Sequence, residues 1–156
     1  MDSLGTGTYI GEHKRTLDDK GRLTVPAAWR PKKPKDPAES APAGTFLAIP
    51  NQSGYISVYP PERVDDLKAK LSKVGLKDRA VRVKLTRFLS KLHEFEFDKQ
   101  GRINISDKLL SGAGITKDVV LLGELASFAI YNPETYASHV DGTDDELDDA
   151  FEEFDL

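Results

Sequence analysis

The sequence contains no cysteine among its 156 residues. Disulfide bonds, thiol chemistry and cysteine-based zinc sites are therefore excluded. Long hydrophobic runs are also missing: no uninterrupted apolar run exceeds four residues, as in residues 119–122, whereas a membrane-spanning helix needs about 20. Residues 1–14 have neither a basic start nor an apolar centre, so no signal peptide is predicted. These absences predict a soluble, cytoplasmic protein with no membrane contact.

Recognisable catalytic motifs are missing as well. The three histidines are scattered, without a pair at helical ligand spacing, and the sequence has no P-loop, dinucleotide fingerprint or nucleophile elbow. Glu94, Glu96 and Asp98 alternate along one expected strand, and we interpret them as an exposed strand face. We therefore predict no catalytic residue, metal site, cofactor or small-molecule substrate.

Acidic residues outnumber basic ones in the chain as a whole but not in its main part. The formal net charge is −4, yet residues 141–156 hold nine acids and no lysine or arginine. Residues 1–140 keep 17 acids and all 22 bases, a formal charge of +5. The folded part is thus predicted to be basic and able to meet an anionic partner, while residues 141–156 form an acidic, disordered tail.

One charged turn occurs twice in the sequence. "TLDDKGRLTV" at residues 16–25 is followed by "EFDKQGRINI" at residues 96–105, and both keep an aspartate, a glycine and an arginine in the same frame at an offset of 80. A second block, "ISVYPPE" at residues 56–62, matches "FAIYNPE" at residues 128–134 at an offset of 72. The first copy is longer by eight residues, which we assign to the proline- and lysine-rich loop at residues 30–44.

We therefore interpret the chain as two copies of one unit. The predicted divisions are a first repeat at residues 8–76, a connecting helix at 77–92, a second repeat at 89–140 and the acidic tail at 141–156. Each unit is read as strand, turn, strand, short helical turn, hairpin and helix, because apolar and polar residues alternate around each turn and helical spacing follows each hairpin. Two short copies suggest a pseudo-two-fold protein rather than a solenoid, which usually needs at least three repeats.

The residues of the repeated turn suit anion recognition. Gly21 and Gly101 can supply the positive φ of a tight loop, and Asp18 and Asp98 can accept hydrogen bonds from the turn amides. An arginine then leaves each turn from a strand, and its guanidinium fork suits phosphate oxygens or the O6/N7 edge of guanine. The structural alternative is a plain hairpin in which each aspartate simply pairs with its arginine.

The motifs together resemble a known family. "GEHKRTLDDKGRLTVPAAWR", "SVYPPERVDDLKAKL", "FDKQGRINIS" and "GITKDVVLLGELASFAIYNPETY" are similar to MraZ, a family of bacterial transcriptional regulators of the division and cell-wall gene cluster. The resemblance covers nearly all of residues 9–140, and the acidic tail is expected to lie outside it. It implies a mainly β protein with helices, a double-split β-barrel of AbrB-like swapped hairpins made from the two repeats.

The resemblance also implies a function. The expected protein is a nucleoid-associated regulator that binds double-stranded DNA at short direct repeats in the promoter of its own operon, as a ring-like homo-oligomer. Carried over to this sequence, the first arginine of the motif pair is the residue most expected to touch DNA. The DNA-binding candidates are Arg22, Lys20, Lys14, Arg15, Arg102 and Lys99, and the turn-ordering residues are Asp18, Gly21, Asp98 and Gly101.

A second hypothesis comes from a different class of protein. The AbrB-like fold also occurs in antitoxins, whose acidic or disordered tails bind a partner protein, so the chain could be an interaction module that acts through residues 141–156. Salt-dependent binding of repeat-containing DNA by the basic part of the chain would separate the two hypotheses.

Overall fold

The computed structural model describes residues 8–31, 44–74, 78–140 and 146–155. Within these ranges the chain forms short strands that alternate with helices. The strands are β1 Glu12–Thr16, β2 Arg22–Thr24, β3 Phe46–Pro50, β4 Ile56–Tyr59, β5 His93–Phe95, β6 Arg102–Asn104, β7 Asp118–Gly123 and β8 Phe128–Tyr131. The helices are the 3-10 turn η2 Ala27–Trp29 and the α-helices α1 Pro61–Val74, α2 Arg79–Leu89, α3 Asp107–Gly112, α4 Pro133–His139 and α5 Glu146–Glu153.

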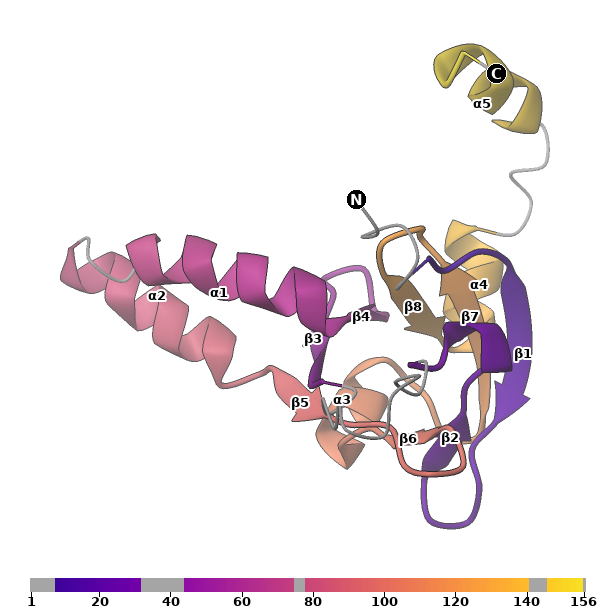
Figure 1. The fold of residues 1–156 in the computed structure, drawn as a ribbon, viewed down its shortest axis with the longest axis horizontal. Coiled ribbons are helices and arrows are strands. Elements are labelled where there is room, and N and C mark those ends of the chain that lie inside the picture. The colour runs from indigo at the N-terminus through magenta and orange to yellow at the C-terminus, as the bar shows by residue number, and fades with distance from the viewer. Residues whose placement is uncertain (1–7, 32–43, 75–77, 141–145, 156) are drawn as a thin grey trace, which may run out of the picture.

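The strands form two antiparallel sheets. Six of them follow the order β1-β7-β8-β4-β3-β5, and β2 pairs with β6 in a separate two-stranded ribbon. Among the described strands the larger sheet does not close into a barrel, because β1 and β5 are its two edges. The class is thus mixed β with helices, as expected, while the arrangement consists of two sheets (Figure 1).

The larger sheet is symmetric with respect to the two halves of the chain. If β1 to β4 are exchanged with their counterparts β5 to β8, the same strand order results, read from the opposite edge. In the larger sheet, β1 lies beside β7 and β5 lies beside β3, while β8 and β4 pair in the middle. The ribbon has the same property, since its two members are β2 and β6. Both sheets therefore contain strands from the two halves of the sequence, and neither half forms its own sheet.

The hydrophobic core lies between the larger sheet and the ribbon. One cluster joins Leu23 of β2, Ile103 of β6 and Phe128 of β8, each of which is at most 1% exposed. Strand alternation places a smaller cluster, which includes Val120 and Tyr131, on the other face of the sheet. The larger cluster contains residues from both halves of the chain, so both halves must fold for it to form.

The helix boundaries follow local capping signals. Ser106 begins α3 by accepting a hydrogen bond from the N–H of Leu109 at 3.3 Å, and Asn132 begins α4 by accepting one from the N–H of Thr135 at 2.7 Å. Asp78 caps α2 in the same way through Val81, at 2.9 Å. Each of these caps joins residues three positions apart, so the helix starts depend on short-range sequence signals.

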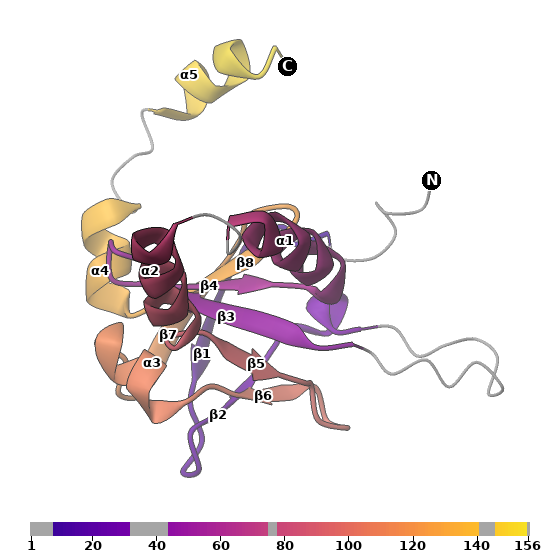
Figure 2. The ribbon, with the colours of Figure 1, turned by 90° about the vertical axis from the view of Figure 1, so that its left-hand side faces the viewer.

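Helices α1, α2 and α5 extend away from the two sheets (Figure 1). Helices α1 and α2 contact each other and project from the body as a pair (Figure 1). Helix α5 stands apart from both sheets in Figures 1 and 2, and its presence at Glu146–Glu153 differs from the disorder expected of residues 141–156. None of the helices in the described ranges has the length and apolar character that a bilayer crossing demands.

Candidate nucleic-acid interface

The first charged turn, between β1 and β2, is ordered by its leading aspartate. Asp18 Oδ1 accepts hydrogen bonds from the N–H groups of Lys20 at 2.9 Å and Arg22 at 2.8 Å, and its Oδ2 accepts one from Arg22 Nε at 2.7 Å. Gly21 adopts a φ of 76°, and its N–H donates to the Asp18 carbonyl. A residue with a side chain is strained at such a φ, so the glycine is required by the turn.

The second turn, between β5 and β6, repeats this geometry closely. Asp98 Oδ1 accepts from the N–H groups of Gln100 at 2.8 Å and Arg102 at 2.9 Å, and Oδ2 accepts from Arg102 Nε at 2.7 Å. Gly101 has a φ of 77°. The two turns are therefore the same structural unit, built twice in one chain.

The carboxylates of both turns remain ionised at neutral pH. The backbone N–H of Arg22 is the main cause that holds the pKa of Asp18 below its ordinary value, and the Arg22 side chain lowers it further. The same groups of Arg102 act on the pKa of Asp98. Each aspartate thus offsets part of its arginine's charge and fixes the direction in which the guanidinium points.

The ion pairs expected of a plain hairpin, in which each aspartate simply pairs with its arginine, are present in both turns. In each pair, however, only Nε of the arginine is engaged with the aspartate. Among the described residues, none accepts a hydrogen bond from the two terminal nitrogens of Arg22 or Arg102. Because these nitrogens form the outer edge of the guanidinium fork, each side chain is held in place with its anion-binding edge free.

The β2–β6 ribbon brings the two arginines together. Leu23 pairs with Ile103 and both point into the core, so Arg22, Thr24, Arg102 and Asn104 lie on the opposite face. Arg22 is opposite Asn104 and Arg102 is opposite Thr24, so the arginines are diagonal neighbours, with backbones about 8 Å apart by standard sheet geometry. A two-stranded ribbon of this kind is narrow enough to enter the major groove of DNA.

The environments of the two turns differ. The first turn projects from the body in both views (Figures 1 and 2), and a Cβ added at Gly21 would meet no atom within 4 Å. A Cβ added at Gly101 would collide with the Arg30 guanidinium, whose Nε donates to the Val25 carbonyl at 2.8 Å. The Gly101 carbonyl also accepts from the N–H of Val25 at 3.1 Å. The second turn is therefore packed against the chain that follows β2, whereas the first is open.

Arg30 is a basic residue at this surface that the sequence did not reveal. It stands at the start of the loop predicted at residues 30–44, yet its side chain lies against Gly101, 71 positions further along the chain. It adds a cation beside the second turn. A contact between positions so distant leaves no periodic signal in one sequence.

The other candidates are distributed over the edge of the sheet and the turn tips. Lys20 and Lys99 are exposed in the two turns. Lys14 is opposite Val120 in β7 and Arg15 is opposite Val119, so strand alternation sends their side chains to opposite faces of β1. The structure therefore does not place Lys14 and Arg15 on one surface. In the described part of the chain, His, Asp and Glu side chains nowhere gather in threes as a metal site would need.

The two glycines provide a matched test of the packing difference. We expect Gly21→Ala to cost about 1 kcal/mol of stability, because alanine is strained at positive φ. Gly101→Ala should cost about 1 kcal/mol more, since it also displaces Arg30 and breaks its hydrogen bond to Val25. Urea unfolding of both variants measures the difference, and equal losses would show that Arg30 does not hold the second turn.

Comparisons with known proteins agree with the fold and motifs. The sequence model of the family described as "MraZ protein, putative antitoxin-like" matches residues 88–154. The match includes most of the acidic segment, so the expectation that this segment lies outside the family pattern was wrong.

Similar proteins cover almost the whole chain. A "Transcriptional regulator MraZ" of Ligilactobacillus salivarius (strain UCC118) is 32% identical over 151 residues, which are 95% of this chain and 99% of that protein. Proteins of the same name from Lactobacillus helveticus (strain DPC 4571) and Chlorobaculum parvum (strain DSM 263 / NCIMB 8327) are 33% and 31% identical, over 94% and 81% of this chain and 96% and 80% of their own lengths. On this evidence the chain belongs to the MraZ family.

Proposed function

We propose that the chain is a DNA-binding transcriptional regulator, without catalytic activity or cofactor. The observation that carries the proposal is the geometry of Arg22, which is fixed by Asp18 through Nε while its outer guanidinium edge is free on an open turn. Relatives that cover nearly the whole chain are named transcriptional regulators, which supports this function.

The proposed target is a set of short direct repeats in the promoter of the chain's own division and cell-wall operon. Arg22 would read a base edge or a phosphate, and Lys20 would contact a nearby phosphate. Lys14 and Arg15, on opposite faces of β1, would reach phosphates on different sides of the turn. Arg102 and Lys99 form the second half of the interface, with a smaller role for Arg102 because its turn is packed against Arg30.

We propose a ring-like homo-oligomer associated with the nucleoid as the active form. A single subunit offers few cationic contacts, and such binding weakens steeply with salt. Several subunits on spaced repeats raise the effective concentration of each turn near its site. We further propose that residues 8–76 and 89–140 are two repeats that together form the double-split barrel; the exchangeable strand order and the twin turns support this division.

A binding titration tests the function. Full-length protein should bind a promoter fragment with direct repeats at least ten times more tightly than a fragment of equal length and composition with shuffled repeats, because base contacts add to phosphate contacts. Gel-shift titrations at two salt concentrations measure both affinities. Equal affinity for the two fragments would exclude sequence-specific regulation, and no binding to either would favour the interaction-module hypothesis.

A further inference from the structure

Helix α5 presents aromatic side chains that nothing in the described chain covers. Phe151 is 50% exposed and Phe154 is 67% exposed, and neither belongs to a hydrophobic cluster of the described residues. The helix has eight residues, whereas isolated helices shorter than about 12 residues are marginal in water. A helix this short with an exposed apolar side is typical of a segment that docks on another surface.

The rest of the exposed surface of α5 is acidic. Asp149, Glu152 and Glu153 are exposed on the helix, and Asp155 is exposed just after it. The partner of this helix should therefore combine an apolar cavity for an aromatic ring with a cationic rim.

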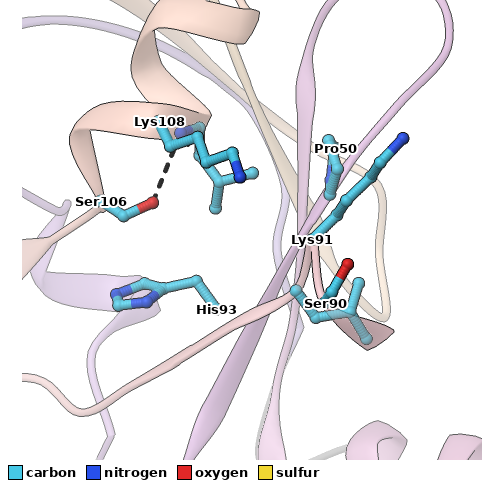
Figure 3. A pocket seen from close by; sticks show the side chains of 8 residues that line it. Pro50, Ser90, Lys91, His93, Ser106 and Lys108 are labelled. Atoms are coloured by element: carbon cyan, nitrogen blue, oxygen red, sulfur yellow. Dashed lines mark hydrogen bonds between the residues drawn. The ribbon is translucent and has the colours of Figure 1, made fainter. Parts of the chain in front are cut away.

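One pocket of the chain has that combination. It has a volume of about 380 Å³ and lies where the end of α2, the start of β5 and α3 meet. Leu92, Leu109 and Pro50 supply its apolar lining, and Figure 3 shows Pro50 at one side of it.

The rim of this pocket is basic. Lys91 comes from the segment after α2, His93 from β5 and Lys108 from α3, and the three side chains surround the same space in Figure 3. None of the described residues that line the pocket is acidic. A cationic rim around an apolar floor suits an acidic helix that inserts an aromatic residue.

We propose that α5 of one copy docks into this pocket of a second copy, with Phe151 or Phe154 in the cavity and the α5 carboxylates at Lys91 and Lys108. A second copy is the occupant because α5 lies away from α2, β5 and α3, the elements that form the pocket (Figure 1), and its aromatic residues are exposed. The tail of one subunit and the pocket of the next are different surfaces, so the contact is head-to-tail, and repeated contacts of this type form a ring when the rotation between neighbouring subunits closes. This inference rests on the oligomer of the proposed function and names the contact that builds it.

The chain is well suited to a cross-linking test because it has no native cysteine. Ser90→Cys puts a thiol in the pocket, and Asp155→Cys puts one beside Phe154 while both aromatic residues stay in place. The two full-length variants, one of them tagged, are co-expressed and treated with a short bis-maleimide. We expect a cross-linked dimer that contains one chain of each kind.

Ser72→Cys is the matched control for the pocket thiol. Ser72 lies in the last turn of α1 and Ser90 is the C-cap of α2; both are exposed, and both donate their hydroxyl to the carbonyl three residues earlier. The dimer yield with Ser90→Cys should exceed the yield with Ser72→Cys at least fivefold, and adding Phe151→Ser and Phe154→Ser to the Asp155→Cys chain should remove this excess. Equal yields from Ser72→Cys and Ser90→Cys, or an excess that survives both serine substitutions, would overturn the proposal.

Two further outcomes are also decisive. If a chain that carries both Ser90→Cys and Asp155→Cys cross-links only within itself, α5 binds its own pocket and the proposed partner is wrong. Native mass spectrometry should show fewer subunits per assembly after Phe151→Ser and Phe154→Ser, and an unchanged mass counts against the contact. All these readouts are made without DNA, so they fail or succeed independently of binding to promoter repeats.

Discussion

Replacing Arg22 with alanine is expected to lower the affinity for a multi-repeat promoter fragment about 5- to 150-fold, because a bidentate arginine contact to a base contributes about 1–3 kcal/mol. The Arg22 side chain does not support the core: it lies on the outer face of the ribbon, and its one hydrogen bond from the guanidinium goes to Asp18 in the same turn. The variant should therefore keep its fold and its subunit number. Gel-shift titration and native mass spectrometry measure affinity and assembly on the same sample.

Two matched variants separate the possible roles of this arginine. Arg22→Lys keeps the positive charge but loses the planar fork, so a base or bidentate phosphate contact predicts an affinity close to that of Arg22→Ala. If Arg22→Lys instead binds like the parent chain, the residue contributes charge alone. Arg102→Ala removes the same side chain from the packed turn and should weaken binding less, and a loss equal to that of Arg22→Ala would give both turns the same role.

The local geometry of the turns could be predicted from the sequence because its causes are local. The positive φ of Gly21, the hydrogen bonds of Asp18 to the turn amides and the strand that carries Arg22 all depend on residues within four positions of each other. The caps at Ser106 and Asn132 follow equally short-range rules. Such features stay the same wherever the turn or helix is placed in the fold.

The pairing between the two halves could not be predicted from periodicity. The register of Leu23 against Ile103 and the contact of Arg30 with Gly101 join positions that are 80 and 71 residues apart. Strand alternation indicates which face of a strand is buried but does not indicate its partner. The difference between two nearly identical turns therefore became visible only in the structure, and it gives a physical reason for ranking Arg22 above Arg102, as the family resemblance already did.

The helix at Glu146–Glu153 was missed for a different reason. Its high acidic content resembles that of a disordered segment, which cannot bury enough apolar surface to fold alone. Phe151 and Phe154 are the signal that could have been read, because aromatic residues spaced by three positions share one side of a helix. Composition alone therefore obscured an amphipathic helix.

Replacing Phe128 with alanine is expected to destabilise the protein by about 3–5 kcal/mol, the usual cost of removing a fully buried aromatic ring. Phe128 is 0% exposed, and its ring centre lies 5.2 Å from those of Tyr9 and Trp29. The substitution thus empties the space where the C-terminal half of the chain packs against the N-terminal half. Because Trp29 is the only tryptophan, its fluorescence during urea unfolding reports directly on this site.

Phe88→Ala is the control for this loss. Phe88 is 39% exposed on α2, outside the core, so its removal should cost less than about 1 kcal/mol at the same protein concentration. If Phe128→Ala proved as mild as Phe88→Ala, the two halves would not depend on this contact. A large loss at Phe128 alone, in a single cooperative transition, would show that both halves fold as one unit, which is what two interleaved sets of strands require.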